Sequence, residues 1–192
     1  DYCFNNLFAG LNGNNTALLT PPELPATTIS AYCYQSAFYN CTSLVKGASL
    51  PALVMTTGCY ISMYMGCTSL TDPGIIGATT VGNNSCFYMY YNCSALKVYD
   101  SPDTGRILFF RCPSNAVQSN MANMLTGTGG DYTSRPVAGD SYYYEGSTPA
   151  ANVAHVNVGG TWKDATPYVN VNGSWKEATP YVNVNGTWKE SS

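Results

Sequence analysis

The stretch AYCYQSAFYNCTSL (residues 31–44) returns twice further along the chain in altered form. GCYISMYMGCTSL ends at Leu70, and SCFYMYYNCSAL ends at Leu96. One column of leucines repeats at steps of 26 residues: Leu18, Leu44, Leu70 and Leu96. A fixed period of this length is the signature of repeat architecture. The sequence therefore predicts that stacked copies of one short unit form the fold.

Each copy combines a helix-like segment with a short polar segment. Cys33, Ala37 and Cys41 stand at i, i+4 and i+8, which puts them on one stripe of a helix. The residue before the second cysteine is of a type that ends helices: Asn40, Gly66 or Asn92. We expect a two-turn helix, then a short strand in TSLVKGAS and TSLTDPGI that pairs in parallel with the next copy. A curved solenoid follows from this pattern.

The paired cysteines have three interpretations. Helical residues eight apart have Cα atoms about 12 Å apart, whereas a disulfide needs them within about 7 Å. The first copy has Leu11 in place of the second cysteine, so that column requires an apolar residue. We expect buried, reduced thiols at Cys33, Cys41, Cys59, Cys67, Cys86 and Cys93. Disulfides between stacked copies are the alternative, and a metal site has least support because the chain has no CxxC pair.

The pattern of AFYNCTSL, a polar turn and SLPA resembles the BspA-like leucine-rich repeats of bacterial surface proteins. The resemblance covers residues 1–100 and implies a repeat protein of the α+β class. The implied fold is a leucine-rich-repeat-like solenoid with short parallel strands and short helices. Family members take part in adhesion and host contact. The third copy departs from the pattern, since PGIIGATT stands where an LPATT-type phrase is expected.

Residues 101–149 are predicted to cap the open end of the solenoid. PSNAVQSNMANMLTGTGG (residues 113–130) has an apolar helical stripe, a possible N-cap at Ser114 and a stop at Gly127. The stripe consists of Val117, Met121, Met124 and Leu125. It is interpreted as core, with partner binding as the alternative. SYYYE (residues 141–145) predicts a strand with Tyr142 and Tyr144 on one face.

Residues 150–192 contain a second repeat with a step of 13 residues. Its units are HVNVGGTWKDATP, YVNVNGSWKEATP and YVNVNGTWKE, and their tryptophans are Trp162, Trp175 and Trp188. Asn-Gly flanked by segments in which apolar and polar residues alternate predicts a β-hairpin with a two-residue turn. Val171 should then pair with Ser174 and Asn170 with Trp175. Isolated hairpins are marginally stable, so we expect stacking within a homo-oligomer or a larger assembly.

The tail also resembles the VNVGGTWK-type hairpin repeats near the ends of phage tail-fibre and tail-associated proteins. This resemblance covers residues 154–190 and implies a virion component. Aromatic hairpins also occur in bacterial wall-binding modules, where aromatic faces stack on sugar rings. Tryptophans that merely pack the hairpins are the plainer interpretation.

Composition excludes several classes of partner. Only 10% of the 192 residues are charged and the net charge is −3, so we expect no nucleic acid. No apolar run approaches eighteen residues, and no signal pattern opens the chain, so we expect no membrane insertion. A surface rich in Asn, Thr, Ser and Tyr favours a virion or extracellular location. The chain begins at Asp1 within a repeat, from which we expect a fragment of a longer protein.

Catalysis is not expected. The sequence shows no nucleophile with a partner base, no paired acids and no phosphate loop, and its single histidine is His155. No cofactor and no metal are predicted. The expected function is non-enzymatic attachment to a bacterial surface glycan or protein, most simply within a phage tail fibre. A bacterial adhesin and a structural spacer are the alternatives. The candidate binding residues are Tyr168, Trp175, Tyr181, Trp188, Tyr39 and Tyr64.

Overall fold

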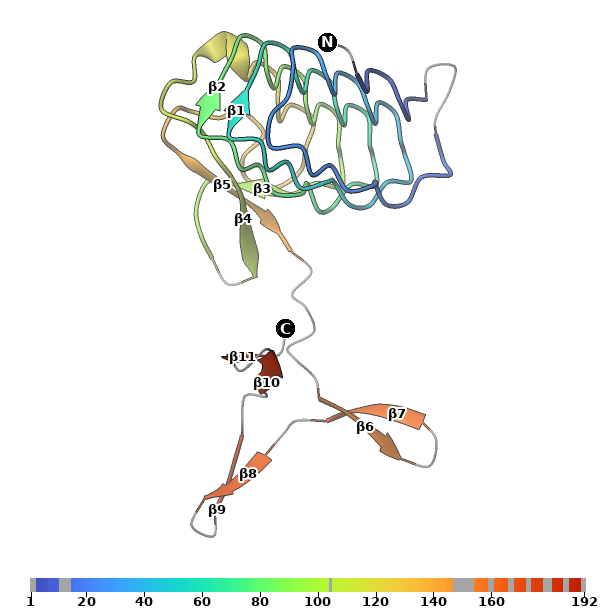
Figure 1. The fold of residues 1–192 in the computed structure, drawn as a ribbon, viewed down its shortest axis with the longest axis vertical. Helices are drawn as coiled ribbons and strands as arrows, with labels where there is room; N and C mark the ends of the chain where they lie inside the picture. Colours follow the sequence, from blue (N-terminus) through green and yellow to red (C-terminus); the bar gives the residue numbers. More distant parts are fainter. Residues whose placement is uncertain are drawn as a thin grey trace. The chain divides into compact units, whose positions relative to one another are not determined.

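The computed structural model describes residues 3–10, 15–103 and 105–146, together with the backbone of six strands between residues 154 and 190 (Figure 1). The chain divides into two compact units, Asp1–Gly146 and Ser147–Ser192. The first unit contains the 26-residue copies and the second contains the tail strands. Domain boundaries at residues 100 and 149 remain predictions.

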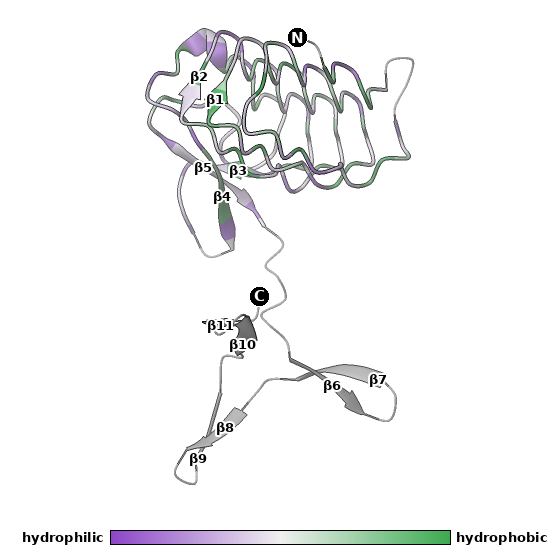
Figure 2. Cartoon of the chain, viewed as in Figure 1, coloured by the Kyte–Doolittle hydropathy of each residue, from purple (hydrophilic) through white to green (hydrophobic). Residues whose placement is uncertain are grey.

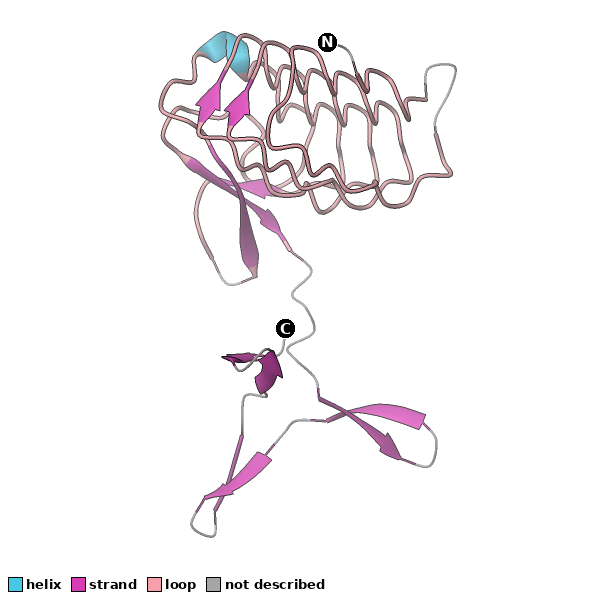
Figure 3. Cartoon of the chain, viewed as in Figure 1, coloured by secondary structure: helices cyan, strands magenta, loops and turns pink. Residues whose placement is uncertain are grey.

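The predicted helices are wrong. Residues 31–40, 57–66 and 83–92 form runs of turns instead (Figure 3). Left-handed backbone recurs at every fourth residue, and Tyr32, Ser36 and Asn40 have φ angles of 58°, 53° and 55°. A right-handed α-helix cannot pass through such residues. The described residues contain one 3₁₀ turn, η1 (Gln118–Asn120), and no α-helix.

Backbone hydrogen bonding alternates along each turn run. Every second N–H bonds within the run, as Gln35 does to the Tyr32 carbonyl at 3.3 Å. The N–H groups between them bond to the next copy, as Tyr34 does to the Cys59 carbonyl at 3.0 Å. Five turn runs are joined side by side in this way: residues 3–10, 31–40, 57–66, 83–92 and 120–127. The copies therefore satisfy one another's backbone groups, which an isolated copy could not do.

Strands in the 26-residue copies are few and short. β1 (Val54–Met55) and β2 (Thr80–Val81) form a two-residue parallel pair. The predicted strands after Leu44 and Leu70 are reduced to single parallel bridges, Lys46 with Asp72 and Leu50 with Ile76. Most of the unit is turns and irregular backbone. The predicted fold class, an α+β leucine-rich-repeat-like solenoid with a helix and a strand in each copy, is therefore wrong.

The core nevertheless uses the predicted leucine column and buries the predicted cysteines. The six expected cysteines are buried and free, and Leu44, Leu70 and Leu96 are 0% exposed. Aromatic rings form a further column, in which Phe8, Phe38, Tyr64 and Tyr90 stack at centroid distances of 5.3–5.4 Å. Apolar and polar residues alternate along the coils (Figure 2). This alternation is how a mostly irregular chain builds a continuous core.

The region after Leu96 adds a sheet and a fifth turn run. β3 (Val98–Tyr99) and β4 (Arg106–Arg111) both pair antiparallel with β5 (Ser141–Glu145). β5 covers the segment predicted as a strand, and its Tyr142 and Tyr144 are buried as expected.

The predicted helix with Ser114 as N-cap is wrong. The backbone turns left-handed at Asn123, with φ of 55°, and the segment joins the fourth run through its carbonyls. Met121, Met124 and Leu125 are buried, whereas Val117 is 59% exposed.

The described strands of the second unit form three antiparallel pairs. The pairs are β6 (Ala154–Val158) with β7 (Thr161–Ala165), β8 (Tyr168–Val171) with β9 (Ser174–Glu177), and β10 (Tyr181–Val184) with β11 (Thr187–Glu190). Val171 pairs with Ser174 and Asn170 with Trp175. The predicted hairpin register is therefore confirmed. The side chains of these strands lie outside the described part of the chain.

Candidate functional site

The turn runs present alternating pairs of residues to the core and to the outer surface. Cys33 and Tyr34 are buried, Gln35 and Ser36 are half-buried, and Ala37 again is buried. The same alternation continues in the neighbouring runs, so the outer residues of successive copies form columns. These columns make up one broad surface of the first unit.

One part of this outer surface is apolar. Gly66 donates its N–H to the Tyr91 carbonyl and Asn40 donates to the Met65 carbonyl, both at 2.8 Å. These bonds place Met65 and Tyr91 in adjacent runs. We define the outer aromatic patch as six half-buried residues on the second, third and fourth runs: Tyr39, Ile61, Met65, Phe87, Tyr88 and Tyr91.

Tyr88 is the unusual member of this patch. Its ring contacts Phe87 edge to face at 4.2 Å and Tyr91 at 5.0 Å. Its backbone is left-handed, with φ of 56°. The equivalent left-handed positions of the other runs hold small polar residues: Asn6, Ser36, Ser62 and Asn123. A bulky side chain at such a position costs about 1 kcal/mol relative to Asn or Gly.

The structure separates the two candidate tyrosines of the first unit. Tyr39 is half-buried within the outer aromatic patch. Tyr64 is 0% exposed and stacks between Phe38 and Tyr90, while its hydroxyl accepts the Ala48 N–H at 2.8 Å. The expectation that Tyr64 faces a ligand is wrong because its ring is part of the core.

The four candidate aromatic residues of the tail are placed only by their backbone. Tyr168 lies in β8, Trp175 in β9, Tyr181 in β10 and Trp188 in β11. Their side chains lie outside the described part of the chain, so an aromatic binding face on the tail remains a prediction.

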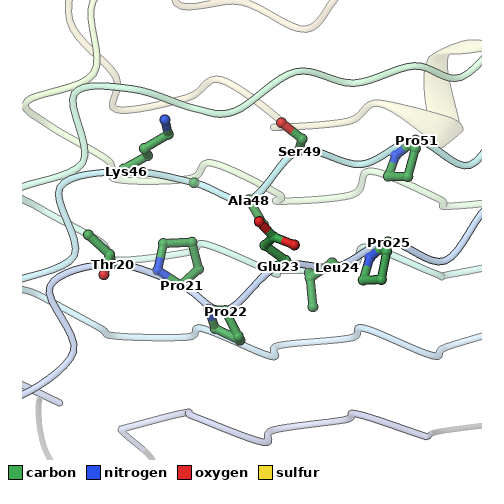
Figure 4. Close-up of a pocket in the computed structure, with 11 residues that line it drawn as sticks. Thr20, Pro21, Pro22, Glu23, Leu24, Pro25, Lys46, Ala48, Ser49 and Pro51 are labelled. Carbon is green, nitrogen blue, oxygen red and sulfur yellow. The ribbon is translucent and has the colours of Figure 1, made fainter.

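A groove of about 370 Å³ lies between the first two copies (Figure 4). Pro25 and Pro51 stand at the same level of two neighbouring coils, and Glu23 and Lys46 supply the charged groups. The remaining lining is small or apolar: Thr20, Pro21, Pro22, Leu24, Gly47, Ala48 and Ser49.

Proline explains why this groove exists. Between the second and third copies, Gly47 donates its N–H to the Asp72 carbonyl at 2.7 Å. Pro21 occupies the equivalent position of the first copy and has no N–H to donate. The first two copies therefore lack this backbone bond. The groove is shallow and carries one carboxylate and one ammonium group, which suits contact with a ligand better than chemistry on one.

Burial holds the thiols of Cys41, Cys59 and Cys67 in a form that does not react. Burial raises the pKa of Cys41 to about 11 and that of Cys59 to about 12. Burial also raises the pKa of Cys67, and the neighbouring Cys93 and Cys41 raise it further. A thiol must lose its proton to act as a nucleophile or a metal ligand. These cysteines therefore serve packing.

Among the described residues, no three His, Cys, Asp or Glu side chains lie close enough together to share a metal ion. In the same residues, no helix has the length and apolar character needed to cross a membrane.

Comparisons with protein-family models, with curated proteins and with solved structures find no match. The candidate site is therefore argued from its own geometry.

Residue spacing in the sequence does not identify most of the outer aromatic patch. The sequence prediction includes Tyr39 but not Phe87, Tyr88 or Tyr91. A usable signal was present, since aligning the copies places Tyr88 in a column that otherwise holds Ser36 and Ser62. A bulky residue in a column of small polar ones marks a position where something other than the backbone selects the side chain.

Proposed function

We propose that this protein is a non-enzymatic attachment module that binds a bacterial surface component through the outer aromatic patch. The observation that carries the proposal is Tyr88, a bulky residue at a left-handed position whose ring lies on the surface with Phe87 and Tyr91. Backbone strain of this kind gathers at binding sites because the function, rather than stability, selects the residue.

The patch has the composition that sugar or protein recognition requires. Its rings offer flat apolar area, and the exposed amides of Asn84 and Asn92 lie in the same turn run. Aromatic faces pack against the C–H faces of sugars, while amides exchange hydrogen bonds with hydroxyl groups. A glycan of the bacterial surface is accordingly the proposed ligand class, with a surface protein as the second.

The proposed context is a phage tail fibre or another virion appendage. Its support is the joining of the two repeat types in one chain. A bacterial surface adhesin is the alternative, and purification of the protein with phage particles or with bacterial cell surfaces would separate the two.

Substituting Tyr88 tests the proposal. Tyr88→Asn restores the residue type found at Asn6 and Asn123, so the fold should be kept and the melting temperature should stay level or rise. Binding of the labelled full chain to bacterial cells, and to purified bacterial polysaccharides, should fall about tenfold or more.

Tyr143→Asn is the control. Tyr143 is a half-buried tyrosine of β5, outside the turn runs that carry the patch. It should leave binding unchanged. Equal binding by wild type and Tyr88→Asn would remove the patch as the site, and absence of binding by wild type would favour a structural spacer.

A further inference from the structure

Cys3 and Cys33 occupy the same level of two adjacent turn runs. The Phe4 N–H donates to the Cys33 carbonyl at 2.8 Å, and the Asn6 N–H donates to the Gln35 carbonyl at 3.1 Å. The rings of Phe4 and Tyr34 stack at 5.2 Å with planes tilted by 8°. Three contacts therefore hold the first run in register with the second. Burial raises the pKa of the Cys33 thiol, and the neighbouring Cys3 thiol raises it further.

This register meets the geometric demand of a disulfide. Neighbouring hydrogen-bonded segments lie about 4.8 Å apart, and disulfides join residues whose Cα atoms are about 4.4–6.8 Å apart. Side chains at equivalent positions of paired copies point the same way, as the stacked rings next to these cysteines do. The spacing of the paired runs is therefore of the size that a disulfide between Cys3 and Cys33 needs.

Access to solvent distinguishes this pair from the other cysteines. Cys3 is exposed, whereas the other seven cysteines are buried. In the second cysteine column the thiols are also engaged, since Cys67 donates to the Phe38 carbonyl and Cys93 to the Tyr64 carbonyl, both at 3.0 Å. An oxidant in solution therefore reaches Cys3 first, and the thiol next to it is Cys33.

We propose that Cys3 and Cys33 are a redox-active pair that closes into a disulfide when the protein meets a disulfide oxidant such as oxidised glutathione. The Cys3 thiolate attacks the oxidant, forms a mixed disulfide and releases one reduced glutathione. The Cys33 thiol then loses its proton to solvent and attacks the Cys3 sulfur, releasing the second glutathione. Two protein thiols are oxidised and one glutathione disulfide is reduced to two thiols.

The bridge fastens a turn run whose apolar side chains are poorly covered. Phe4 is 41% and Leu7 is 55% exposed in the first run, whereas the equivalent Tyr34 and Ala37 of the second run are 3% and 2% exposed. A covalent link between Cys3 and Cys33 keeps the first run on the second when its hydrogen bonds open. An oxidising extracellular setting would close the link, and a reducing one would open it.

The experiment treats the full reduced chain with a glutathione redox buffer under native conditions. The expected product has six free thiols, from the eight cysteines of the chain. No disulfide should join two protein molecules. Digestion after aromatic residues should release a peptide that joins Cys3 to Cys33. The oxidised protein should also resist proteolysis within residues 3–10 longer than the reduced protein does.

Cys3→Ser is the matched control, because Cys3 is exposed and its replacement leaves the core intact. This variant should keep its seven thiols free under the same buffer. The proposal is overturned if Cys3 stops at the glutathione adduct, if it links two molecules, or if the bridge joins Cys33 to Cys59 instead.

Discussion

The thiol of Cys67 donates a hydrogen bond to the carbonyl oxygen of Phe38 in the neighbouring turn run, at 3.0 Å. The same contact recurs one copy earlier, from Cys41 to Phe8 at 3.2 Å, and one copy later, from Cys93 to Tyr64 at 3.0 Å. A small apolar side chain with a weak donor fits this column because it fills the core and meets a carbonyl of the adjacent copy. The column of Cys41, Cys67 and Cys93 is therefore explained by packing between copies, without disulfides.

Replacing Cys67 with alanine should destabilise the first unit moderately. The change removes a buried sulfur and its hydrogen bond, although the Phe38 carbonyl keeps the Cys41 N–H at 3.1 Å. We expect the free energy of unfolding to fall by about 1–2 kcal/mol. Urea titration measures it, and the exposed Cys3→Ala provides the control with no expected change. Equal effects of the two substitutions would argue against a packing role for this column.

The repeat period and the buried columns could be predicted from the sequence, because apolar residues that recur every 26 positions must face a shared core. The local backbone could not. A spacing of four places Cys33 and Ala37 on one face of a helix, and it does the same in a chain that turns every four residues. The choice between them depends on hydrogen bonds to residues about 25 positions away, which no local pattern reveals.

The same ambiguity explains the error at Tyr64. In a helix, a residue next to the inward Met63 points about 100° away from the core. In the turn run, inward residues come in adjacent pairs, so Met63 and Tyr64 are both 0% exposed. Tyr39 falls in an outward pair and remains accessible. Which residues are predicted to face the surface therefore depends on the backbone conformation that is assumed.

Glycine at position 66 should resist substitution. Gly66 has a φ of 77°, and a Cβ there would overlap the Asn40 side-chain oxygen. Gly66→Ala should lower the free energy of unfolding by about 1–3 kcal/mol, through the left-handed conformation and the overlap together. Asn92→Gly is the informative partner, because that column accepts both residue types and the change should be almost neutral. Thermal unfolding of both variants checks the pair, and a tolerated Gly66→Ala would contradict the described turn.

Removing one hydroxyl group from the core should be costly. The Tyr64 hydroxyl accepts the buried N–H of Ala48 at 2.8 Å, so Tyr64→Phe leaves that N–H without its acceptor. We expect a loss of about 1–3 kcal/mol in unfolding free energy. Tyr143→Phe, on the half-buried side of β5, should cost little. Both variants remove one tyrosine hydroxyl group. A similar loss of unfolding free energy in both would contradict the hydrogen bond from Ala48 to Tyr64.

The free energy of unfolding should fall in alkaline solution. The pKa values of the buried thiols set the pH range in which it falls. Burial raises the pKa of Cys41 from 9.0 to about 11 and that of Cys59 from 9.0 to about 12. Below pH 9 these thiols are protonated in both the folded and the unfolded chain, so their contribution does not change with pH. Above pH 9 the unfolded chain releases protons that the folded chain retains, which favours unfolding until the folded thiols titrate as well.

The urea midpoint should therefore be level from pH 6 to 8 and should decrease between about pH 9 and 12. Buried tyrosines add to the decrease at its upper end, since burial also raises the pKa of Tyr144 to about 12. Cys59→Ala separates the contributions: it lowers stability at pH 7 but removes one titrating thiol, so its midpoint should fall less steeply above pH 9. A midpoint that stays level to pH 11 in wild type would mean that these thiols are accessible to solvent, which contradicts the buried columns.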